Sequence, residues 1–353
     1  SFIELFNEEN GFLLRSNILV DGIESKTAAA RRAFPELIDI GIMGHCHAAK
    51  SGICENAGVD CYQNATSTGK SNMALSSYKH LLLQCKGKTF QVALGGAGDP
   101  NKHENFQEIL EFTREQHIVP NLTTSGYDIL ESEIQIIRKY CGSVAVSFYS
   151  RLDMSMKETN SHTISAVNSL ISAGCKVNIH FILSNDSLDE AIYRVQNNLF
   201  PKGINAVIFL LYKPVGRGAS EKVIDFTNKK YIEFLENIHL KATEFRVGFD
   251  TCQSPGLIYN NQNIRAEAID SCEAARFSMY IDSELNAFPC SFGLDKKDYQ
   301  ISLKNIAILD AWNSDQFEQF RARQDTMCKF CDVDGCLGCA LGLGLNLCGH
   351  VPS

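Results

Sequence analysis

The amino-acid sequence predicts an α/β protein with a parallel sheet, followed by a separate cysteine-rich domain. The first observation is a rhythm over residues 38–250, where apolar, β-rich runs alternate with amphipathic helical stretches. Near-continuous apolar strands are typical of sheets covered on both faces, and strand–helix repetition indicates right-handed parallel crossovers. The second observation is that five of the 14 cysteines fall between Cys328 and Cys348.

Six apolar runs are predicted to be the strands: 37–43, 89–95, 117–124, 143–149, 176–183 and 205–212. The helices predicted between them lie near 69–85, 103–116, 128–140, 159–173 and 187–198. Six such units suit either a partial β/α barrel or a doubly wound sheet. We expect residues 1–37 to be a short lead-in, 38–250 the α/β domain and 251–353 the cysteine-rich domain. In that last domain, 309–323 is predicted to be a packing helix that carries Trp312.

Gly or polar residues follow each predicted strand. "GIMGHC" leaves the first strand, "GGAGDP" the second and "TTSG" the third, and the later strands end in "SFYSR", "LSND" and "YKPVGRG". In both candidate architectures the active site lies at the carboxyl ends of the strands. The sequence therefore predicts a ligand-lined site at this end of the sheet. Tyr149, Arg151, Lys213 and Arg217 are candidates to orient a substrate there, or else rim charges and barrel packing.

Composition excludes several classes of function. The 353 residues are 44% hydrophobic and carry a net charge of −8, so no basic face predicts a nucleic-acid partner. No run of about 18 apolar residues predicts a membrane span. No basic and apolar leader is visible at the start, so we expect a cytoplasmic protein in which dense cysteines are metal ligands and not disulfides.

The cysteine-rich tail reads Cys328-x2-Cys331-x4-Cys336-x2-Cys339-x8-Cys348 and is preceded by Cys272 and Cys290. Cysteines two residues apart present both sulfur atoms from one tight turn. Adding Cys252 gives eight thiolates, enough for two four-thiolate sites. On spacing alone, structural zinc and iron–sulfur clusters fit equally well.

A second group of thiols favours iron–sulfur chemistry. Cys46, Cys54 and Cys61 follow the first strand, with seven and then six residues between them. Three thiolates make an unusual zinc site, whereas on a 4Fe–4S cluster they leave one iron open for a small chelating cofactor. The glycines of "GGAGDP" let the backbone approach such a ligand closely. Cys85, Cys141 and Cys175 lie in or beside helical stretches and are predicted to be small buried hydrophobes.

These motifs resemble the radical S-adenosylmethionine enzymes with a SPASM domain, over roughly residues 37–350. The resemblance implies a partial (β/α)6 radical SAM barrel with a C-terminal Cys-rich SPASM domain, three 4Fe–4S clusters and S-adenosylmethionine. One cluster binds S-adenosylmethionine and two are auxiliary. In the family, one electron cleaves the sulfonium to a 5′-deoxyadenosyl radical, which takes a hydrogen atom from the substrate.

The resemblance also implies roles for individual residues. Cys46, Cys54 and Cys61 match the ligands of the radical cluster, although their C-x7-C-x6-C spacing departs from the family's C-x3-C-x2-C. "GGAGDP" resembles the family's GGEP motif, so Gly95, Gly96 and Asp99 are expected to contact the methionine amino group. The other cofactor-binding positions that it implies are Thr124, Ser125, Ser147, Asn178, His180 and Val215.

For the tail, the family pattern assigns Cys272, Cys290 and Cys339 to the nearer auxiliary cluster, with Cys252 in "FDTC" as the fourth ligand. The outer cluster is then held by Cys328, Cys331, Cys336 and Cys348. If all eight thiolates bind, neither auxiliary cluster has an open iron. That favours electron transfer and a net-oxidative reaction.

Enzymes of this family mostly modify ribosomally made peptides, so the expected partner is a peptide, crosslinked through a thioether or carbon–carbon bond. An external flavodoxin- or ferredoxin-like reductant and a separate leader-binding partner are also expected. The alternatives are a peptide epimerase, a sulfatase-maturase-like oxidase or a non-catalytic zinc or iron–sulfur scaffold. The maturase alternative is disfavoured because Ser291 and Phe292 follow Cys290 where an acid is expected.

Overall fold

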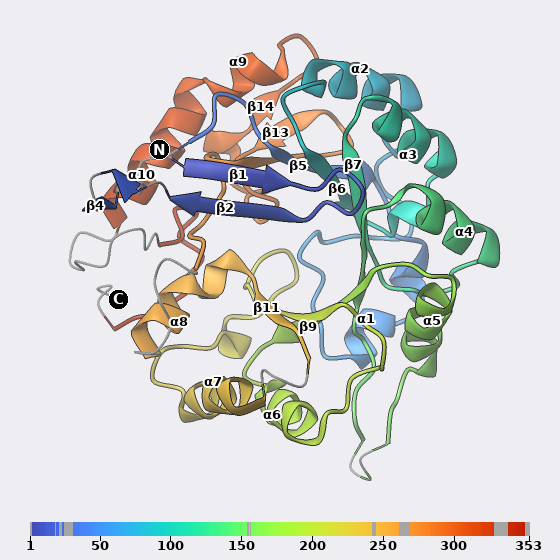
Figure 1. Cartoon of the computed structure of the whole chain (residues 1–353), viewed down its shortest axis with the longest axis vertical. Helices are drawn as coiled ribbons and strands as arrows, with labels where there is room; N and C mark the ends of the chain where they lie inside the picture. The colour runs from blue at the N-terminus through green and yellow to red at the C-terminus, as the bar shows by residue number, and fades with distance from the viewer. Residues whose placement is uncertain are drawn as a thin grey trace.

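The computed structural model describes residues 2–17, 19–20, 23–24, 31–153, 155, 157–241, 245–260, 269–327 and 338–349. Its main feature is a ten-stranded sheet with the order β11-β10-β9-β8-β7-β6-β5-β12-β13-β14. The helices surround this sheet (Figure 1). The predictions made for Cys328, Cys331 and Cys336 lie outside the described residues.

All six predicted strands are present, and their ends differ from the predictions by no more than a few residues. They are β5 (Leu37–Met43), β6 (Gln91–Gly96), β7 (Val119–Thr124), β8 (Val144–Ser147), β9 (Val177–Leu183) and β10 (Ala206–Leu211). The five predicted helices are α2 (Leu75–Cys85), α3 (Phe106–Glu115), α4 (Glu131–Tyr140), α5 (Ser161–Ser172) and α6 (Leu188–Asn197).

The strand order decides between the two candidate architectures. Strands β5 to β11 lie beside one another in strict chain order, and every pair among them is parallel. A doubly wound sheet reverses its order at a switch point, which places helices on both faces. Here each right-handed crossover advances in the same direction, so the helices cover one face. The sheet is therefore a partial barrel.

Two elements of the barrel were not predicted from the sequence. A helix, α7 (Lys229–Lys241), and a three-residue strand, β11 (Val247–Phe249), follow β10. The predicted helix 309–323 is also wrong in one respect, because it is two helices, α9 (Ile308–Trp312) and α10 (Asp315–Met327). Trp312 is fully buried at the end of α9, as expected of a packing residue.

The sheet does not end with the barrel. On the other side of β5, strand β12 (Ser278–Ile281) pairs with it in parallel. Two short antiparallel strands continue outward from β12, namely β13 (Asn286–Phe288) and β14 (Ile301–Ser302). The cysteine-rich region thus shares a continuous hydrogen-bonded sheet with the barrel, and the first barrel strand is the seam between them.

The lead-in folds as a β-hairpin that crosses the barrel beside β5, β6 and β7 (Figure 1). Its strands are β1 (Phe2–Phe6) and β2 (Leu13–Asn17), and a shorter pair, β3 (Leu19–Val20) and β4 (Ile23–Glu24), follows. The ring of Phe6 stacks on that of Phe90 at 4.9 Å. Arg114 donates to the carbonyl oxygens of Glu8 at 2.5 Å and Glu9 at 3.0 Å. The tip of the hairpin is therefore held at the amino-terminal ends of β6 and β7.

The core consists of two apolar clusters on the helix-covered face of the sheet. One gathers β5 to β8 with α2 to α4 and extends to Trp312 and Phe317 of the cysteine-rich region. The other gathers β9 and β10 with α6 and α7, and packs Phe181, Phe209 and Phe234 together. In β9 the side chains alternate strictly between buried and half-buried. Its polar residues therefore face the inside of the barrel.

No helix among the described residues has both the length and the apolar character that crossing a membrane requires.

A buried group of charged residues joins the hairpin to the barrel and to the cysteine-rich region. Arg15 of β2 forms ion pairs with Glu4 at 3.3 Å and with Glu273 at 3.1 Å, and it donates to the carboxyl group of Glu36, whose side chain is 2% exposed. Burial raises the pKa of Glu36 to about 8, the neighbouring Glu4 adds to the rise, and Arg15 opposes it. Glu36 therefore binds a proton in the folded chain at a pH where an ordinary glutamate has lost it.

The raised pKa of Glu36 predicts that the chain loses stability as the pH rises. Between about pH 5 and pH 8 the folded state binds more protons than the unfolded state, so the free energy of unfolding should fall by up to about 1.4 kcal/mol per pH unit. Urea unfolding at a series of pH values measures this slope. Glu36→Gln is the control, because an amide cannot titrate, and it should flatten the curve. A slope that is the same in Glu36→Gln would contradict the assignment.

Candidate metal centres

The first group of candidate ligands lies on the loop that follows β5. Cys46 begins a short 3-10 turn over His47–Lys50, and Cys54 lies in the one-turn helix α1 (Ile53–Asn56). Gly52 precedes α1 with a left-handed φ of 70°. Such a turn is one that glycine adopts without steric cost. The loop is compact because these two turns shorten its path between the cysteines.

Cys46, Cys54 and Cys61 are half-buried, and the ionisation of Cys46 and Cys54 responds to the neighbouring thiols. Burial raises the pKa of Cys54 to about 11, and a hydrogen bond with Tyr149 opposes the rise, while the other two thiols add to it. Burial also raises the pKa of Cys46, with Asp99 and Cys61 contributing in the same direction. Three thiols that repel one another when ionised form a natural site for a positively charged metal centre.

Contacts from two barrel strands hold this loop in place. Beyond β8, Arg151 donates from Nε to the carbonyl oxygen of Ala57 at 2.9 Å. Beyond β10, the hydroxyl of Tyr212 donates to Asp60 at 2.6 Å, and the backbone N–H of Arg217 donates to the carbonyl of Cys61 at 3.1 Å. The loop is thus anchored at the carboxyl ends of the barrel strands, between its second and third cysteines and at the third cysteine itself.

The glycine-rich segment after β6 lies against the beginning of the same loop. Gly96 has a φ of +118°, and a Cβ atom there would lie 2.6 Å from the carbonyl oxygen of Met43. A Cβ on Gly98 would lie 2.4 Å from the carbonyl oxygen of His45 and 3.1 Å from the Cα of Cys46. In contrast, a Cβ on Gly95 would meet nothing within 4 Å. The absence of side chains at Gly96 and Gly98 lets the backbone of the cysteine loop pack closely against this segment, whereas the position beside Gly95 is open.

Asp99 links the ends of β6 and β7. Its carboxylate accepts hydrogen bonds from the backbone N–H of Ser125 at 2.9 Å and from the Ser125 hydroxyl, and Nε2 of His47 lies 3.9 Å away. Burial raises the pKa of Asp99, and the bonds from Ser125 oppose the rise. The neighbouring Thr124 donates to Asn101 at 2.9 Å. The structure therefore brings Gly95, Asp99 and Ser125 to one end of the sheet beside the three thiols.

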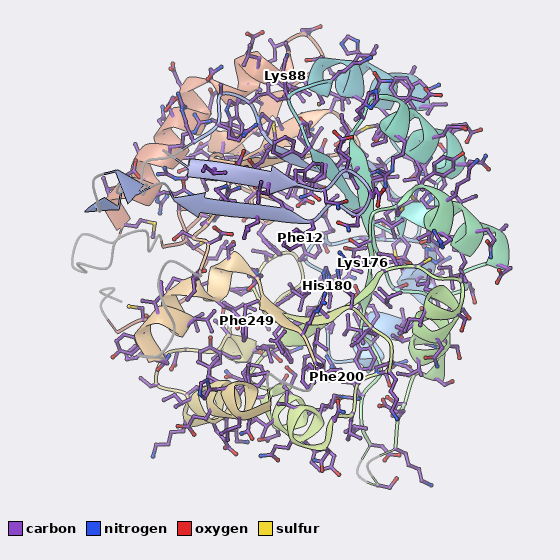
Figure 2. All side chains as sticks on the ribbon, in the orientation of Figure 1. Phe12, Lys88, Lys176, His180, Phe200 and Phe249 are labelled. Atoms are coloured by element: carbon purple, nitrogen blue, oxygen red, sulfur yellow. The ribbon has the colours of Figure 1, made fainter. Side chains whose placement is uncertain are left out.

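The remaining predicted cofactor positions are less closely grouped. Ser147 ends β8 and is paired in register with His180 of β9, which lies toward the centre of the molecule (Figure 2). Burial lowers the pKa of His180 to about 4, and Asp250 opposes the shift. Val215 packs against the larger core cluster. Asn178 lies near the amino-terminal start of β9 and accepts a hydrogen bond from Asn205 at 2.7 Å, so the structure does not place it with the others.

A second group of thiols is assembled from distant parts of the chain, and we call Cys252, Cys272, Cys290 and Cys339 the four-thiol group. Burial raises the pKa of Cys290 to about 12, and Cys272 and Cys339 add to the rise. Burial raises the pKa of Cys252 in the same way, with contributions from Cys272 and Cys290. These four thiols therefore lie near one another although four separate segments supply them. Cys348 is buried elsewhere in the tail.

Sequence reasoning missed a buried ion pair beside the four-thiol group. Lys213 was expected to orient a substrate, or else to be a rim charge or part of the barrel packing; its side chain is 3% exposed and pairs with Asp250, an acid that was not singled out. The signal was present in "FDTC", where an acid stands two residues before Cys252. The side chains of Arg151 and Arg217 likewise hold the cysteine loop, by donating to the carbonyl oxygens of Ala57 and Ala65. A further missed acid is Asp39 of β5, whose pKa is raised to about 6 by burial.

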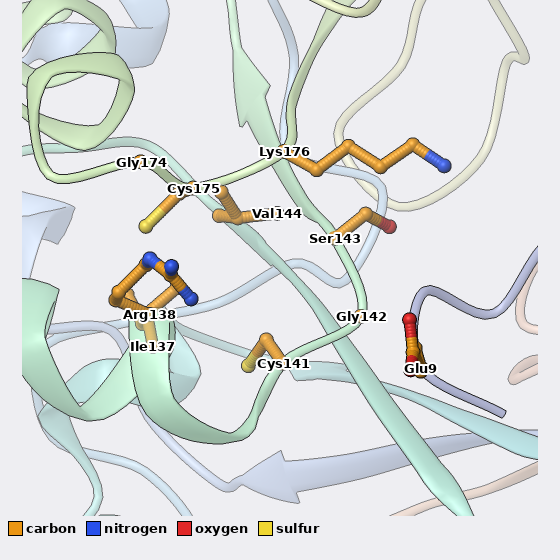
Figure 3. Close-up of a pocket in the computed structure, with 10 residues that line it drawn as sticks. All are labelled: Glu9, Ile137, Arg138, Cys141, Gly142, Ser143, Val144, Gly174, Cys175 and Lys176. Atoms are coloured by element: carbon orange, nitrogen blue, oxygen red, sulfur yellow. The ribbon is translucent and has the colours of Figure 1, made fainter.

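A cleft of about 150 Å³ opens at the opposite end of the barrel strands, where β8 and β9 begin (Figure 3). Its lining includes Arg138, Lys176 and two of the remaining thiols, Cys141 and Cys175. These two are half-buried and pack against the core, whereas Cys85 is fully buried as predicted. The cleft is separate from both thiol groups and lies far along the strands from Ser147 and Leu183.

The donor sets fit iron–sulfur clusters better than single metal ions. Within the described ranges, no three His, Cys, Asp or Glu side chains converge closely enough to hold one metal ion. A cubane cluster is held at separate corners, so its thiolates gather around a volume and need not meet at a point. Thiols that are near one another without converging, such as Cys46, Cys54 and Cys61, fit that requirement. The four-thiol group fits it equally.

Comparisons with known proteins agree with this arrangement. Residues 272–337 match the SPASM domain, an iron–sulfur cluster-binding domain. Streptococcus suis SuiB bound to S-adenosylmethionine superposes with a TM-score of 0.65 at 19% identity, over 88% of this chain and 74% of that chain. SuiB bound to the precursor peptide SuiA superposes with a TM-score of 0.68 at 19% identity, over 92% of this chain and 76% of that chain. The AdoMet-bound protein anSMEcpe superposes with a TM-score of 0.62 at 16% identity, over 89% of this chain and 93% of that chain. No curated protein matches the chain by sequence.

The sheet order and the thiol loop after its first strand define the class of fold. The chain has the same partial-barrel fold as SuiB and anSMEcpe, and a partial barrel is the fold that the sequence predicted. Its C-terminal segment, residues 272–337, is a SPASM iron–sulfur cluster-binding domain. The predicted architecture of a barrel followed by a SPASM domain is thereby confirmed.

The close packing of the cysteine loop against the segment that follows β6 predicts different effects on stability for substitutions at two of its glycines. Gly98→Ala should lower the free energy of unfolding by about 1–3 kcal/mol, because the new methyl group would overlap the backbone at His45. Gly95→Ala is the matched control, since its methyl group would enter open space, and its effect should stay within about 0.5 kcal/mol. Urea unfolding of both variants measures the difference. Equal midpoints would contradict this account of the loop.

Proposed function

We propose that this chain is a radical S-adenosylmethionine enzyme that modifies a ribosomally made peptide. The observation that carries the proposal is the juxtaposition of Cys46, Cys54 and Cys61 with Gly95 and Asp99 at one end of a barrel that continues into a SPASM domain. The three thiols hold a 4Fe–4S cluster with one open iron. When bound, that cluster and S-adenosylmethionine supply a 5′-deoxyadenosyl radical for hydrogen-atom abstraction.

The residues around the loop have separate tasks in this proposal. Gly95 leaves room for the amino-acid part of S-adenosylmethionine, and Asp99 presents a carboxylate, fixed by Ser125, toward its amino group. Thr124, Ser147, His180 and Val215 border the rest of the cofactor. Asn178 was predicted to join them, but its bond to Asn205 near the start of β9 makes it the weakest member of the set.

The auxiliary clusters follow from the remaining thiols. The four-thiol group holds the nearer cluster, and Cys348 joins Cys328, Cys331 and Cys336 in the outer one. Four thiolates leave no open iron on the nearer cluster, so it suits electron transfer better than direct substrate binding. We therefore propose a net-oxidative product, a thioether or carbon–carbon crosslink. Joining two peptide residues removes one hydrogen atom and one proton, and the remaining electron needs an acceptor.

The partners follow from the same reasoning. SuiB has been crystallised with a precursor peptide, and a peptide is the substrate that we propose here. The first electron comes from an external flavodoxin- or ferredoxin-like protein. We also propose that a separate partner reads any leader sequence.

Iron and sulfide content provides the first test of the cluster count. An anaerobically reconstituted preparation should be brown and contain about 12 Fe and about 12 sulfide per chain, because three 4Fe–4S clusters require that number. Colorimetric iron and sulfide assays on the purified chain measure it. A colourless preparation loaded with zinc would exclude the enzyme and leave the alternative of a structural scaffold.

Substitution of the loop thiols tests the proposed site of cleavage. Cys46→Ala, Cys54→Ala and Cys61→Ala should each abolish formation of 5′-deoxyadenosine in the presence of reductant, because each removes a ligand of the radical cluster. Cys175→Ala is the matched control, since that half-buried thiol lies at the opposite end of the barrel. Liquid chromatography of the reaction measures the nucleoside. Retention of cleavage in all three loop variants would overturn the proposed function.

A further inference from the structure

Among the described residues, Lys213 is the most deeply buried lysine. It lies two residues beyond the end of β10, and its side chain is 3% exposed. Its Nζ donates to the carbonyl oxygen of Leu211 at 2.8 Å and to the carboxylate of Asp250. A lysine ammonium has three N–H donors, so two are used by these bonds. The ammonium also lies 4.5 Å from the centre of the Phe292 ring.

These contacts place the positive charge beside two residues that flank candidate ligands. Asp250 stands two residues before Cys252, and Phe292 stands two residues after Cys290. Burial alone would lower the pKa of Lys213, but Asp250 and the thiols of Cys252 and Cys290 raise it above its ordinary value. The ion pair with Asp250 keeps Lys213 charged, and the contacts with Asp250 and Phe292 place that charge beside the segments that carry Cys252 and Cys290.

Asp250 does not account for this buried charge by itself. A buried ion pair carries a desolvation cost that its own attraction often fails to recover, and apolar residues of similar size commonly replace such pairs without loss of stability. The pair here is also incompletely satisfied, because Oδ1 of Asp250 is buried without a hydrogen-bond partner among the described residues. A negatively charged cluster on the four-thiol group would give the buried ammonium a function, because the ammonium would then stabilise charge on the cluster as well as pair with Asp250.

We propose that Lys213 is a positioning residue that sets the reduction potential of the cluster held by the four-thiol group. This inference rests on the proposed function, because it takes Cys252, Cys272, Cys290 and Cys339 as cluster ligands. Reduction adds one electron to the cluster, and no bond forms or breaks. A fixed positive charge beside the thiolates stabilises the added negative charge, so it favours the reduced form. Asp250 acts in the opposite sense and moderates the effect.

The consequence for the reaction is a cluster poised to accept an electron. A net-oxidative crosslink needs such an acceptor, and a cluster surrounded only by apolar groups and thiolates is harder to reduce. Lys213 lies on the loop that follows the barrel strand β10, whereas Cys272 and Cys290 come from the SPASM domain. The charge that tunes the cluster is thus supplied by the barrel and not by the SPASM domain.

The test is a redox titration of the full chain, reconstituted with its clusters and monitored by electron paramagnetic resonance. The signal that disappears in Cys272→Ser identifies the cluster concerned. Lys213→Met should shift its equilibrium about tenfold toward the oxidised form, which lowers the midpoint potential by about 59 mV. Lys213→Arg keeps the charge and should leave the potential close to that of the unaltered chain. Asp250→Asn removes the opposing charge and should raise the potential.

Opposite shifts in Lys213→Met and Asp250→Asn would support the inference, because a merely structural pair would shift both in one direction or neither. If Lys213→Met does not fold, Asp250→Asn alone decides, and an unchanged or lower potential overturns the inference. The iron content of the ligand variants distinguishes a wrong assignment of the cluster ligands from a wrong role for Lys213. If Cys272→Ser and Cys252→Ser retain all the iron, the proposed ligands are wrong. If the cluster is present and neither charge variant moves its potential, only the role of Lys213 is wrong.

Discussion

The parallel pairing of β12 with β5 is the interaction on which the rest of the molecule depends. β5 is already the first strand of the barrel and pairs with β6 along its other edge. Ile38, Ile40 and Ile42 of β5 are almost completely buried, so the strand cannot shift its register by one residue without exposing them. Because β12 takes its register from β5, the position of the SPASM domain is set by the same strand that leads into the three-cysteine loop.

Contacts across this seam connect the two candidate metal centres. A Cβ atom on Gly41 of β5 would lie 2.3 Å from the hydroxyl oxygen of Tyr280 on β12, so the absence of a side chain makes room for the phenol. The same hydroxyl accepts a hydrogen bond from Gln63 at 3.4 Å, just beyond the third cysteine of the loop. The ring of Tyr62 packs on Phe292 at 5.0 Å, and Phe292 in turn covers the ammonium of Lys213. One short chain of aromatic and polar side chains therefore links the loop to the four-thiol group.

The sequence predicted the six main barrel strands because each is an apolar run bounded by Gly or polar residues. It did not predict β11, since the three residues Val247–Phe249 are too few to show a period. It did not predict the β1–β2 hairpin either, because Ile3, Leu5 and Leu14 are exposed on it and no second apolar face distinguishes it from a coil. The grouping of Cys252 with Cys339 could be expected only from a resemblance. No local spacing relates thiols that are brought together by the pairing of distant strands.

In the long cysteine loop, tertiary contacts hold the three thiols together, a role that short spacing between the cysteines fills in more compact motifs. Short gaps between cysteines hold three thiols together through the local turn alone, whereas gaps of seven and six residues leave the chain free to spread. Here the 3-10 turn and α1 take up the extra length, and Gly98 and Gly216 let the backbone of neighbouring loops approach Cys46 and Cys61 directly. Arg151 and Tyr212 then fix the middle of the loop to β8 and β10. The ordering entropy of a longer loop is thus offset by contacts that only the folded barrel can provide, so this thiol group forms together with the barrel and not before it.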